Sequence, residues 1–185
     1  MQSAEQGRNE YAGFGKVRSR VEPAFCAWTI DALRALEWKR FELLCASYYG
    51  VVGFKSETLQ CGVAGSIDVK LYKFDPTKPL AVVQCKAWSS PVGVKEIQEL
   101  FGVMAHEKVG RGIFITNSTY TKDTRTFGNS NSIQLLEGTS FIQKLWELPQ
   151  HERDVLFKAA FEGGLPYADL RILRNQHGQA RGRTQ

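Results

Sequence analysis

Two long stretches of the chain place apolar residues at every third or fourth position, which is the spacing of an amphipathic helix. The first covers residues 28–49 and is followed by Gly50, a residue type that commonly ends helices. The second covers residues 93–108. Capping residues and a proline predict three shorter helices, at residues 122–128, 139–148 and 151–162.

Strands are predicted where this spacing changes. Residues 67–72 alternate apolar with polar positions, as a strand with one buried face does. Residues 80–83 and 112–116 are continuous apolar runs, which are typical of strands buried on both faces. Residues 51–54 and 133–136 predict two short strands. A hairpin followed by strands that alternate with helices indicates an α/β fold, with a mixed β-sheet flanked by helices in a single domain.

The two ends of the chain differ in composition from this central part. Residues 1–27 hold few apolar side chains and predict a flexible leader. Residues 171–185 carry four arginines and no acidic residue. We therefore divide the chain into the leader, a folded domain (28–148), a C-terminal helix (149–164) and a basic tail (165–185).

Composition narrows the class of protein further. The net charge of +5 over 185 residues is compatible with a polyanionic partner such as DNA. The chain shows no secretory signal and no apolar run long enough to cross a bilayer, so we expect a cytoplasmic protein without a membrane partner. The four cysteines form no C-x-x-C pair, and Cys45 and Cys85 stand in apolar surroundings that predict burial.

Polar residues that could take part in catalysis lie on the predicted hairpin. Asp68 lies on its first strand, and Gln84 and Lys86 end its second strand. Gln84 and Lys86 share a face because side chains alternate along a strand. Asp68 joins them only if it pairs with residue 84 or 86 rather than with Cys85, and turn asymmetry decides which. Otherwise Asp68 is a solvent-exposed strand residue and Lys86 a strand end that reaches into water.

A carboxylate, an amide oxygen and a lysine at one place are what metal-assisted phosphodiester hydrolysis requires. The Gln84 side-chain oxygen and the backbone carbonyl of Cys85 can bind a hard cation, and Lys86 would position or help deprotonate the attacking water. Glu42, at the edge of the apolar stripe of the first helix, would add a metal ligand, directly or through water. The alternative for Glu42 is a boundary glutamate paired with Lys39.

Residues around this constellation suggest contacts to a phosphate backbone. Gly65 and Ser66 belong to a run of small residues before the aspartate, and small residues allow close approach of a phosphate. Lys70 and Lys95 are two of several lysines nearby. The alternatives are an ordinary turn and a solvated basic face. No P-loop and no G-x-G-x-x-G motif supports nucleotide hydrolysis or dinucleotide binding.

Several motifs then follow one another in a characteristic order, and together they resemble the Mrr-type restriction endonuclease catalytic domain, a branch of the PD-(D/E)xK nucleases. These motifs are Trp38–Leu44, Gly65–Asp68, Val83–Trp88, Val92–Met104, Gly112–Thr116 and Leu135–Gly138. Two departures stand out. Ser66 replaces a second glycine that the family usually has, and Gly164–Gln185 lacks the paired cysteines of a zinc ribbon that many relatives carry there.

The resemblance implies a restriction-endonuclease-like fold, with Glu42, Asp68, Gln84 and Lys86 as the active site. Gln84 stands where other PD-(D/E)xK enzymes have glutamate. The resemblance also implies Mg²⁺ or Mn²⁺ as cofactor, DNA as substrate and a role in restricting foreign or modified DNA. Nucleases with one active site per chain often cut both strands as homodimers, so a homodimer is a further expectation. The alternatives are a DNA-binding module on the same fold that does not cut, and a repair or junction nuclease.

Overall fold

The computed structural model describes residues 27–59 and 68–163, so the predicted leader, the basic tail, Gly65 and Ser66 lie outside the described residues. Its helices are α1 (Ile30–Ala35), α2 (Trp38–Val51), α3 (Val94–His106), α4 (Lys122–Ser130), α5 (Gly138–Trp146), α6 (Gln150–Lys158) and the π-helical turn η1 (Ala159–Gly163). Its strands are β1 (Lys55–Leu59), β2 (Asp68–Tyr72), β3 (Ala81–Lys86), β4 (Gly112–Thr116) and β5 (Ile133–Leu136).

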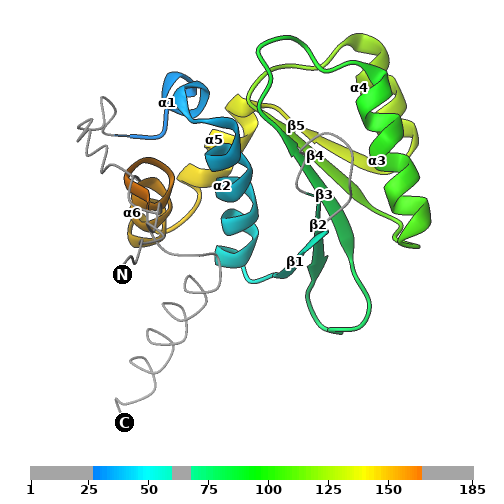
Figure 1. The fold of residues 1–185 in the computed structure, drawn as a ribbon, viewed down its shortest axis with the longest axis horizontal. Helices are drawn as coiled ribbons and strands as arrows, with labels where there is room; N and C mark the ends of the chain where they lie inside the picture. Colours follow the sequence, from blue (N-terminus) through cyan, green and yellow to red (C-terminus); the bar gives the residue numbers. More distant parts are fainter. Residues whose placement is uncertain (1–26, 60–67, 164–185) are drawn as a thin grey trace, which may run out of the picture.

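The five strands form one sheet in the order β1-β2-β3-β4-β5 (Figure 1). The first three strands pair antiparallel, and β3, β4 and β5 pair parallel. The parallel pairs are connected through α3 and α4, as parallel strands require a crossover. The predicted mixed sheet with flanking helices is confirmed.

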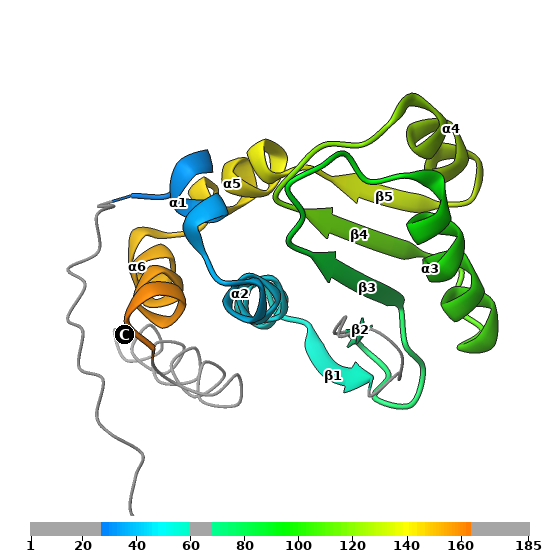
Figure 2. The same cartoon turned by 45° about the horizontal axis from the view of Figure 1, so that its top comes forward.

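Helices cover both faces of the sheet, with α2 on one side and α3 and α4 on the other (Figures 1 and 2). Strand β3 divides its side chains between the two layers. Val83 and Cys85 belong to the core that α2 also lines, whereas Val82 belongs to the core that α3 lines. The two faces of β3 are therefore distinct environments, and the face on which a polar residue stands decides which helices it can meet.

The first predicted helix is two helices in the structure. Thr29 caps α1, because its side-chain oxygen accepts a hydrogen bond of 3.1 Å from the Ala32 amide. The chain leaves the helical conformation at Leu36, whose backbone is extended and whose side chain is buried, and α2 begins at Trp38. Spacing alone did not reveal this break, since apolar positions continue across it.

The predicted strand at residues 51–54 is wrong. Val51 is the last residue of α2, and Gly53 adopts a φ of 94°, which favours glycine. The Phe54 amide donates a hydrogen bond of 2.9 Å to the Tyr49 carbonyl, which closes the end of the helix. Gly53, and not Gly50 as the sequence predicted, therefore ends the helix. The first strand begins at Lys55.

The C-terminal helices pack against α2. Arg40 on α2 donates hydrogen bonds of 2.9 and 3.0 Å from its guanidinium to the carbonyls of Ala160 and Phe161. Trp28, just before α1, meets Phe157 of α6 edge to face at 5.1 Å between ring centroids. Among the described residues, no helix is long and apolar enough to cross a membrane.

Candidate active site

The register of the β2–β3 hairpin places Asp68 directly opposite Gln84. Residues paired across an antiparallel ladder stand on the same face of the sheet, so Asp68 occupies the face of Gln84 and of Lys86, two positions further on. Cys85 belongs to the other face. The register that the sequence left open is therefore the one that the nuclease chemistry requires.

The turn of the hairpin explains this register. The Asp75 carboxylate accepts hydrogen bonds from the Thr77 amide (2.8 Å) and hydroxyl (2.6 Å), an Asx turn that fixes the loop. These bonds lower the pKa of Asp75, the hydroxyl contributing most. The Leu80 amide donates to the Leu71 carbonyl at 2.7 Å, so the ladder resumes immediately after Pro79.

Gln84 is a buried polar residue in an otherwise apolar strand. Only 4% of its surface is exposed, and its neighbours along β3 are Val82, Val83 and Cys85. It stands between Asp68 on β2 and Phe114 on β4. Burying an amide is unfavourable unless a specific partner or ligand engages it. The burial of this amide sets Gln84 apart from its apolar neighbours on β3.

Lys86 ends β3 and is half-buried, opposite Thr116 on β4. Its ammonium lies 5.3 Å from the ring centroid of Trp88. A cation over an indole is held by about 0.5–2 kcal/mol, depending on its exposure. Trp88 therefore restricts the position of the Lys86 ammonium at the strand end.

Glu42 approaches the same end of β3 from the other side of the sheet. It is only 3% exposed, so it is buried and not a boundary residue. Helix α2 leads directly into β1, and β1 runs parallel to β3 because both strands pair antiparallel with β2. The last turn of α2 therefore lies near the start of β3, and its first turns lie towards the C-terminal end of β3. One turn after Glu42, Cys45 contacts Cys85. The structure thus unites Asp68, Gln84 and Lys86 on one face and places Glu42 beneath the strand that carries two of them.

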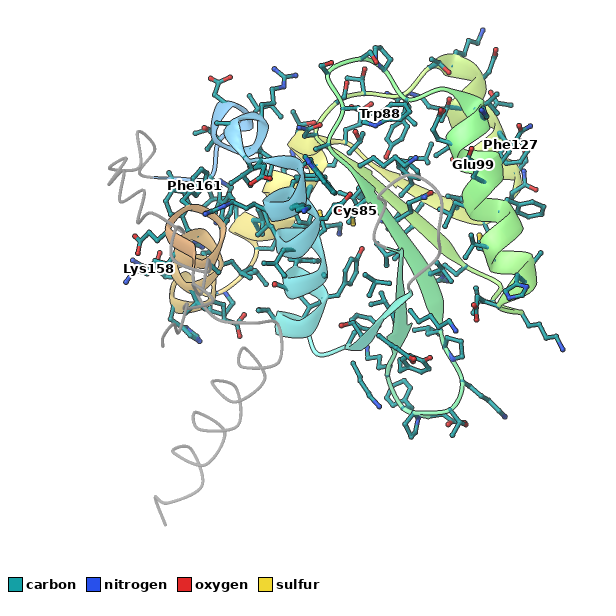
Figure 3. The ribbon with its side chains drawn as sticks, viewed as in Figure 1. Cys85, Trp88, Glu99, Phe127, Lys158 and Phe161 are labelled. Carbon is teal, nitrogen blue, oxygen red and sulfur yellow. The ribbon has the colours of Figure 1, made fainter. Side chains whose placement is uncertain are left out.

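The Cys85 thiol belongs to the core and not to the face of Asp68. Figure 3 shows Cys85 on the α2 side of the sheet. Burial raises the pKa of the neighbouring Cys45 thiol, and its hydrogen bond to Cys85 and the charges of Cys85 and Glu42 add to this effect. Because the Cys85 side chain lies in this core, its backbone carbonyl rather than its thiol is the candidate metal ligand.

The two predicted DNA-binding lysines differ in their environment. The Lys70 ammonium forms an ion pair of 2.5 Å with Glu107, which neutralises its charge. Lys95 is exposed in the first turn of α3. Of these two lysines, Lys95 alone presents an exposed side chain to an approaching phosphate.

A cavity of about 590 Å³ adjoins the site, and sequence reasoning missed it. Its walls include Trp38 of α2, Trp88 after β3 and Asn117 after β4. The Asn117 side-chain oxygen accepts a hydrogen bond of 2.8 Å from the Trp88 amide, which joins the two strand ends. The sequence signal that could have indicated it is Trp88, an aromatic residue two positions after Lys86.

The residue types at the strand end fit a hard divalent cation. Within the described ranges, no three His, Cys, Asp or Glu residues form a metal-binding group. By residue type, the predicted ligands are oxygen donors: the Asp68 carboxylate, the Gln84 amide oxygen and the Cys85 carbonyl, with the Glu42 carboxylate on the other side of the sheet. Oxygen donors of this kind select Mg²⁺ or Mn²⁺ over zinc.

Comparisons with known proteins identify relatives of this chain. From Escherichia coli (strain K12), the Type IV methyl-directed restriction enzyme EcoKMrr is 36% identical over 66 residues, which cover 35% of this chain and 22% of that enzyme. This chain therefore spans less than a quarter of that relative.

Two solved structures are similar at 13% identity. The DNA modification-dependent restriction endonuclease AspBHI aligns with a TM-score of 0.51. The alignment covers 73% of this chain and 39% of the AspBHI chain. The MspJI restriction endonuclease in complex with a 27-mer oligonucleotide aligns with a TM-score of 0.48, over 71% of this chain and 35% of its own. The likeness to AspBHI supports a restriction-endonuclease-like fold.

A sequence-family model described as restriction endonuclease (Mrr_cat) matches residues 33–145, which is more than half of the chain. The match includes every element that carries Glu42, Asp68, Gln84 and Lys86. The chain belongs to the Mrr-type family of restriction endonuclease catalytic domains.

Proposed function

We propose that this chain is a divalent-metal-dependent endonuclease that hydrolyses phosphodiester bonds in DNA. The observation that supports this most directly is the pairing of Asp68 with Gln84, with Lys86 two residues further on the same strand. Family membership supports the same reaction class. A module that only binds DNA would have no use for an amide buried beside an aspartate and a lysine.

In this proposal, Asp68, Gln84 and Glu42 hold Mg²⁺ or Mn²⁺, with the Cys85 carbonyl as a further ligand. The bound ion supplies Lewis-acid stabilisation of the scissile phosphate and lowers the pKa of its water. Gln84 is a neutral ligand, so the site carries one negative charge fewer than a site with glutamate there.

Lys86 orients the attacking water through its ammonium and stabilises the charge that develops on the phosphate oxygens. The cation–π contact with Trp88 limits the positions that this ammonium can adopt. The apolar residues around Gln84 exclude bulk water, which strengthens each of these electrostatic interactions.

We further propose that the substrate is foreign or modified DNA, because the relative EcoKMrr is described as methyl-directed. Lys95 would contact the DNA backbone without reading its sequence, together with Gly65 and Ser66 of the loop before β2. Lys70 would do so only if it left its ion pair with Glu107. The protein would act in the cytoplasm, and a homodimer would supply one active site for each strand.

Cleavage of a supercoiled plasmid by the purified protein tests this proposal. We expect nicking with Mg²⁺ or Mn²⁺ and none with EDTA. Asp68→Ala and Lys86→Ala should abolish it, whereas Lys78→Ala, an exposed lysine on the hairpin turn, should not. Cutting in EDTA, or undiminished cutting by both active-site variants, would refute the mechanism. DNA binding without nicking under any divalent metal would favour a non-cutting module.

Plasmids and duplexes of different structure separate the nuclease roles. Methylated and unmethylated plasmids test restriction of modified DNA, and branched substrates test junction or repair cleavage. Preference for methylated DNA would support the restriction role, whereas preference for branched DNA would favour the repair role.

A further inference from the structure

The cavity beside the active site lies just beyond the end of β3, the strand that carries Gln84 and Lys86. Ala87, Trp88 and Ser89 follow Lys86 and form one wall, and Trp38 lies one helical turn before Glu42. Asn117 and Ser118 follow β4 at the strand end that pairs with Lys86. In open α/β sheets, ligands bind beyond the carboxyl ends of the strands, which is where this cavity lies.

The walls combine two indoles with basic and amide groups. Trp38 is 43% exposed, a large share for a tryptophan side chain, and the Lys39 ammonium lies 5.2 Å from its ring centroid. Trp88 is the second indole, with the Lys86 ammonium 5.3 Å from its centroid. Arg34 also lines the cavity, and none of the described lining residues is acidic. Flat apolar surfaces next to cations are the features that bind a base together with its phosphate.

The volume of about 590 Å³ falls within the roughly 300–1,000 Å³ of typical small-molecule sites and is ample for one nucleotide. Asn117 and the serines of the lining provide donors and acceptors suited to the edge of a base. We propose that this cavity receives an unstacked nucleobase of the DNA strand held at the active site. This proposal rests on the proposed function only in naming DNA as the polymer.

Binding of an unpaired base explains why the aromatic surface faces solvent beside the catalytic lysine. A base inside a duplex has both faces covered by its neighbours, so only a flipped, bulged or single-stranded base can stack on Trp38 or Trp88. Extruding a base is least costly where it is unpaired or mismatched. The cavity would therefore favour DNA with a local defect over an intact duplex.

A fluorescent base analogue tests this proposal without any cleavage. A duplex with one bulged 2-aminopurine and a fully paired duplex of the same sequence are titrated with the protein in EDTA. We expect tighter binding of the bulged duplex, on the order of tenfold, and quenching of 2-aminopurine as it stacks on indole. Trp38→Ala should remove both the tighter binding and the quenching. Because Trp38 is exposed, this substitution should not unfold the protein.

Matched variants separate the cavity from general DNA binding. Phe74→Ala removes an aromatic residue that is 91% exposed in the hairpin turn, at the opposite end of β3, and should leave the preference intact. Arg34→Ala should weaken binding of the bulged duplex, whereas Arg111→Ala, before β4, should not. Trp88→Phe should keep the stacking that Trp88→Ala loses.

The outcomes distinguish this inference from the nuclease proposal. Equal binding of bulged and paired duplexes, no binding of either, or an undiminished preference in Trp38→Ala would overturn the inference, whether or not plasmid is cut. Lys86→Ala should keep the preference while it loses cleavage. A wild-type protein that prefers the bulged duplex but never cuts with a metal would overturn the nuclease proposal and leave the base site standing.

Discussion

Asp68 on β2 and Gln84 on β3 face each other across the hairpin as a direct cross-strand pair. A slip of one residue would put Asp68 opposite Cys85 and move it to the core face that α2 covers. The register of one short hairpin therefore decides whether the chain has a candidate metal site at all.

The first prediction concerns Gln84→Glu, which places a second carboxylate opposite Asp68. Like charges directly opposite each other destabilise a sheet, so we expect the metal-free variant to be less stable by about 1 kcal/mol. A divalent cation would relieve this repulsion. Mg²⁺ should therefore raise the melting temperature of the variant more than that of the wild type.

Thermal unfolding with and without Mg²⁺ measures this difference. The matched control is Gln134→Glu, because Gln134 is exposed on β5. It should change neither the metal-free stability nor the response to Mg²⁺. An equal Mg²⁺ response in Gln84→Glu and wild type would contradict the assignment of Gln84 as a ligand.

The second prediction concerns Glu42→Gln, which keeps the shape of the side chain and removes its charge. If Glu42 supports the metal, plasmid cleavage should fall about 10–100-fold. The free energy of unfolding of the metal-free variant is measured alongside, so that a loss of cleavage can be separated from a loss of stability. Glu99→Gln, on the exposed side of α3, serves as the control and should leave both quantities unchanged. Full activity in Glu42→Gln would remove this residue from the site.

The third prediction concerns stability at high pH. Burial raises the pKa values of Tyr48, Tyr49 and Tyr120, and it raises the pKa of Tyr72 to about 12 with help from its hydrogen bond to Glu57. These groups hold their protons more tightly when folded. Their contribution is complete below the unfolded tyrosine pKa of about 10 and is lost as the pH rises towards the folded values.

We therefore expect the free energy of unfolding to fall above about pH 10, by about 1.4 kcal/mol per pH unit for each such tyrosine. Urea unfolding at a series of alkaline pH values measures the slope. Tyr49→Phe removes one of these groups, so its slope should be shallower than that of the wild type. A slope identical to the wild type would show that Tyr49 does not titrate differently in the folded and unfolded chain.

The fourth prediction compares two glycines. A Cβ atom on Gly138, at the start of α5, would lie 2.8 Å from the Ile30 side chain and 3.2 Å from the backbone oxygen of Asn117. Backbone atoms cannot move aside easily, so Gly138→Ala should cost about 1–3 kcal/mol. It should also disturb the cavity wall that Asn117 forms.

Gly102→Ala is the matched control. Gly102 is exposed within α3, and nothing lies within 4 Å of an added Cβ. Alanine favours a helix over glycine, so this variant should gain about 0.5–1 kcal/mol. Chemical denaturation of both variants tests the pair. Equal effects on the free energy of unfolding would contradict the close approach at Gly138.

Local patterns in the sequence were sufficient for most of the fold. The apolar run at Gly112–Thr116 is a strand with those bounds, because burial on both faces leaves a signal in consecutive residues. The predicted strand at Ile133–Leu136 also has those bounds. The break at Leu36 and the helix end at Gly53 were not predictable from spacing. Both depend on backbone conformations that tertiary packing selects.

The residues proposed for the site could be named from the sequence, but their arrangement could not. Gln84 and Lys86 share a face by the period of the strand alone, whereas the partner of Asp68 depended on the hydrogen bonds of Asp75 in the turn. The cavity escaped prediction because its walls come from segments far apart in the chain, such as Trp38 and Asn117. No local pattern records that these segments meet.

The hydrogen bonds from Arg40 to the carbonyls of Ala160 and Phe161 determine how short a working fragment can be. The family match ends at residue 145, yet Leu156 and Ala160 complete the core under the helix that carries Glu42. A chain cut at the family boundary would uncover that core and deprive the Arg40 guanidinium of both acceptors. We therefore expect that the shortest fragment that keeps Glu42 in position extends to the end of η1.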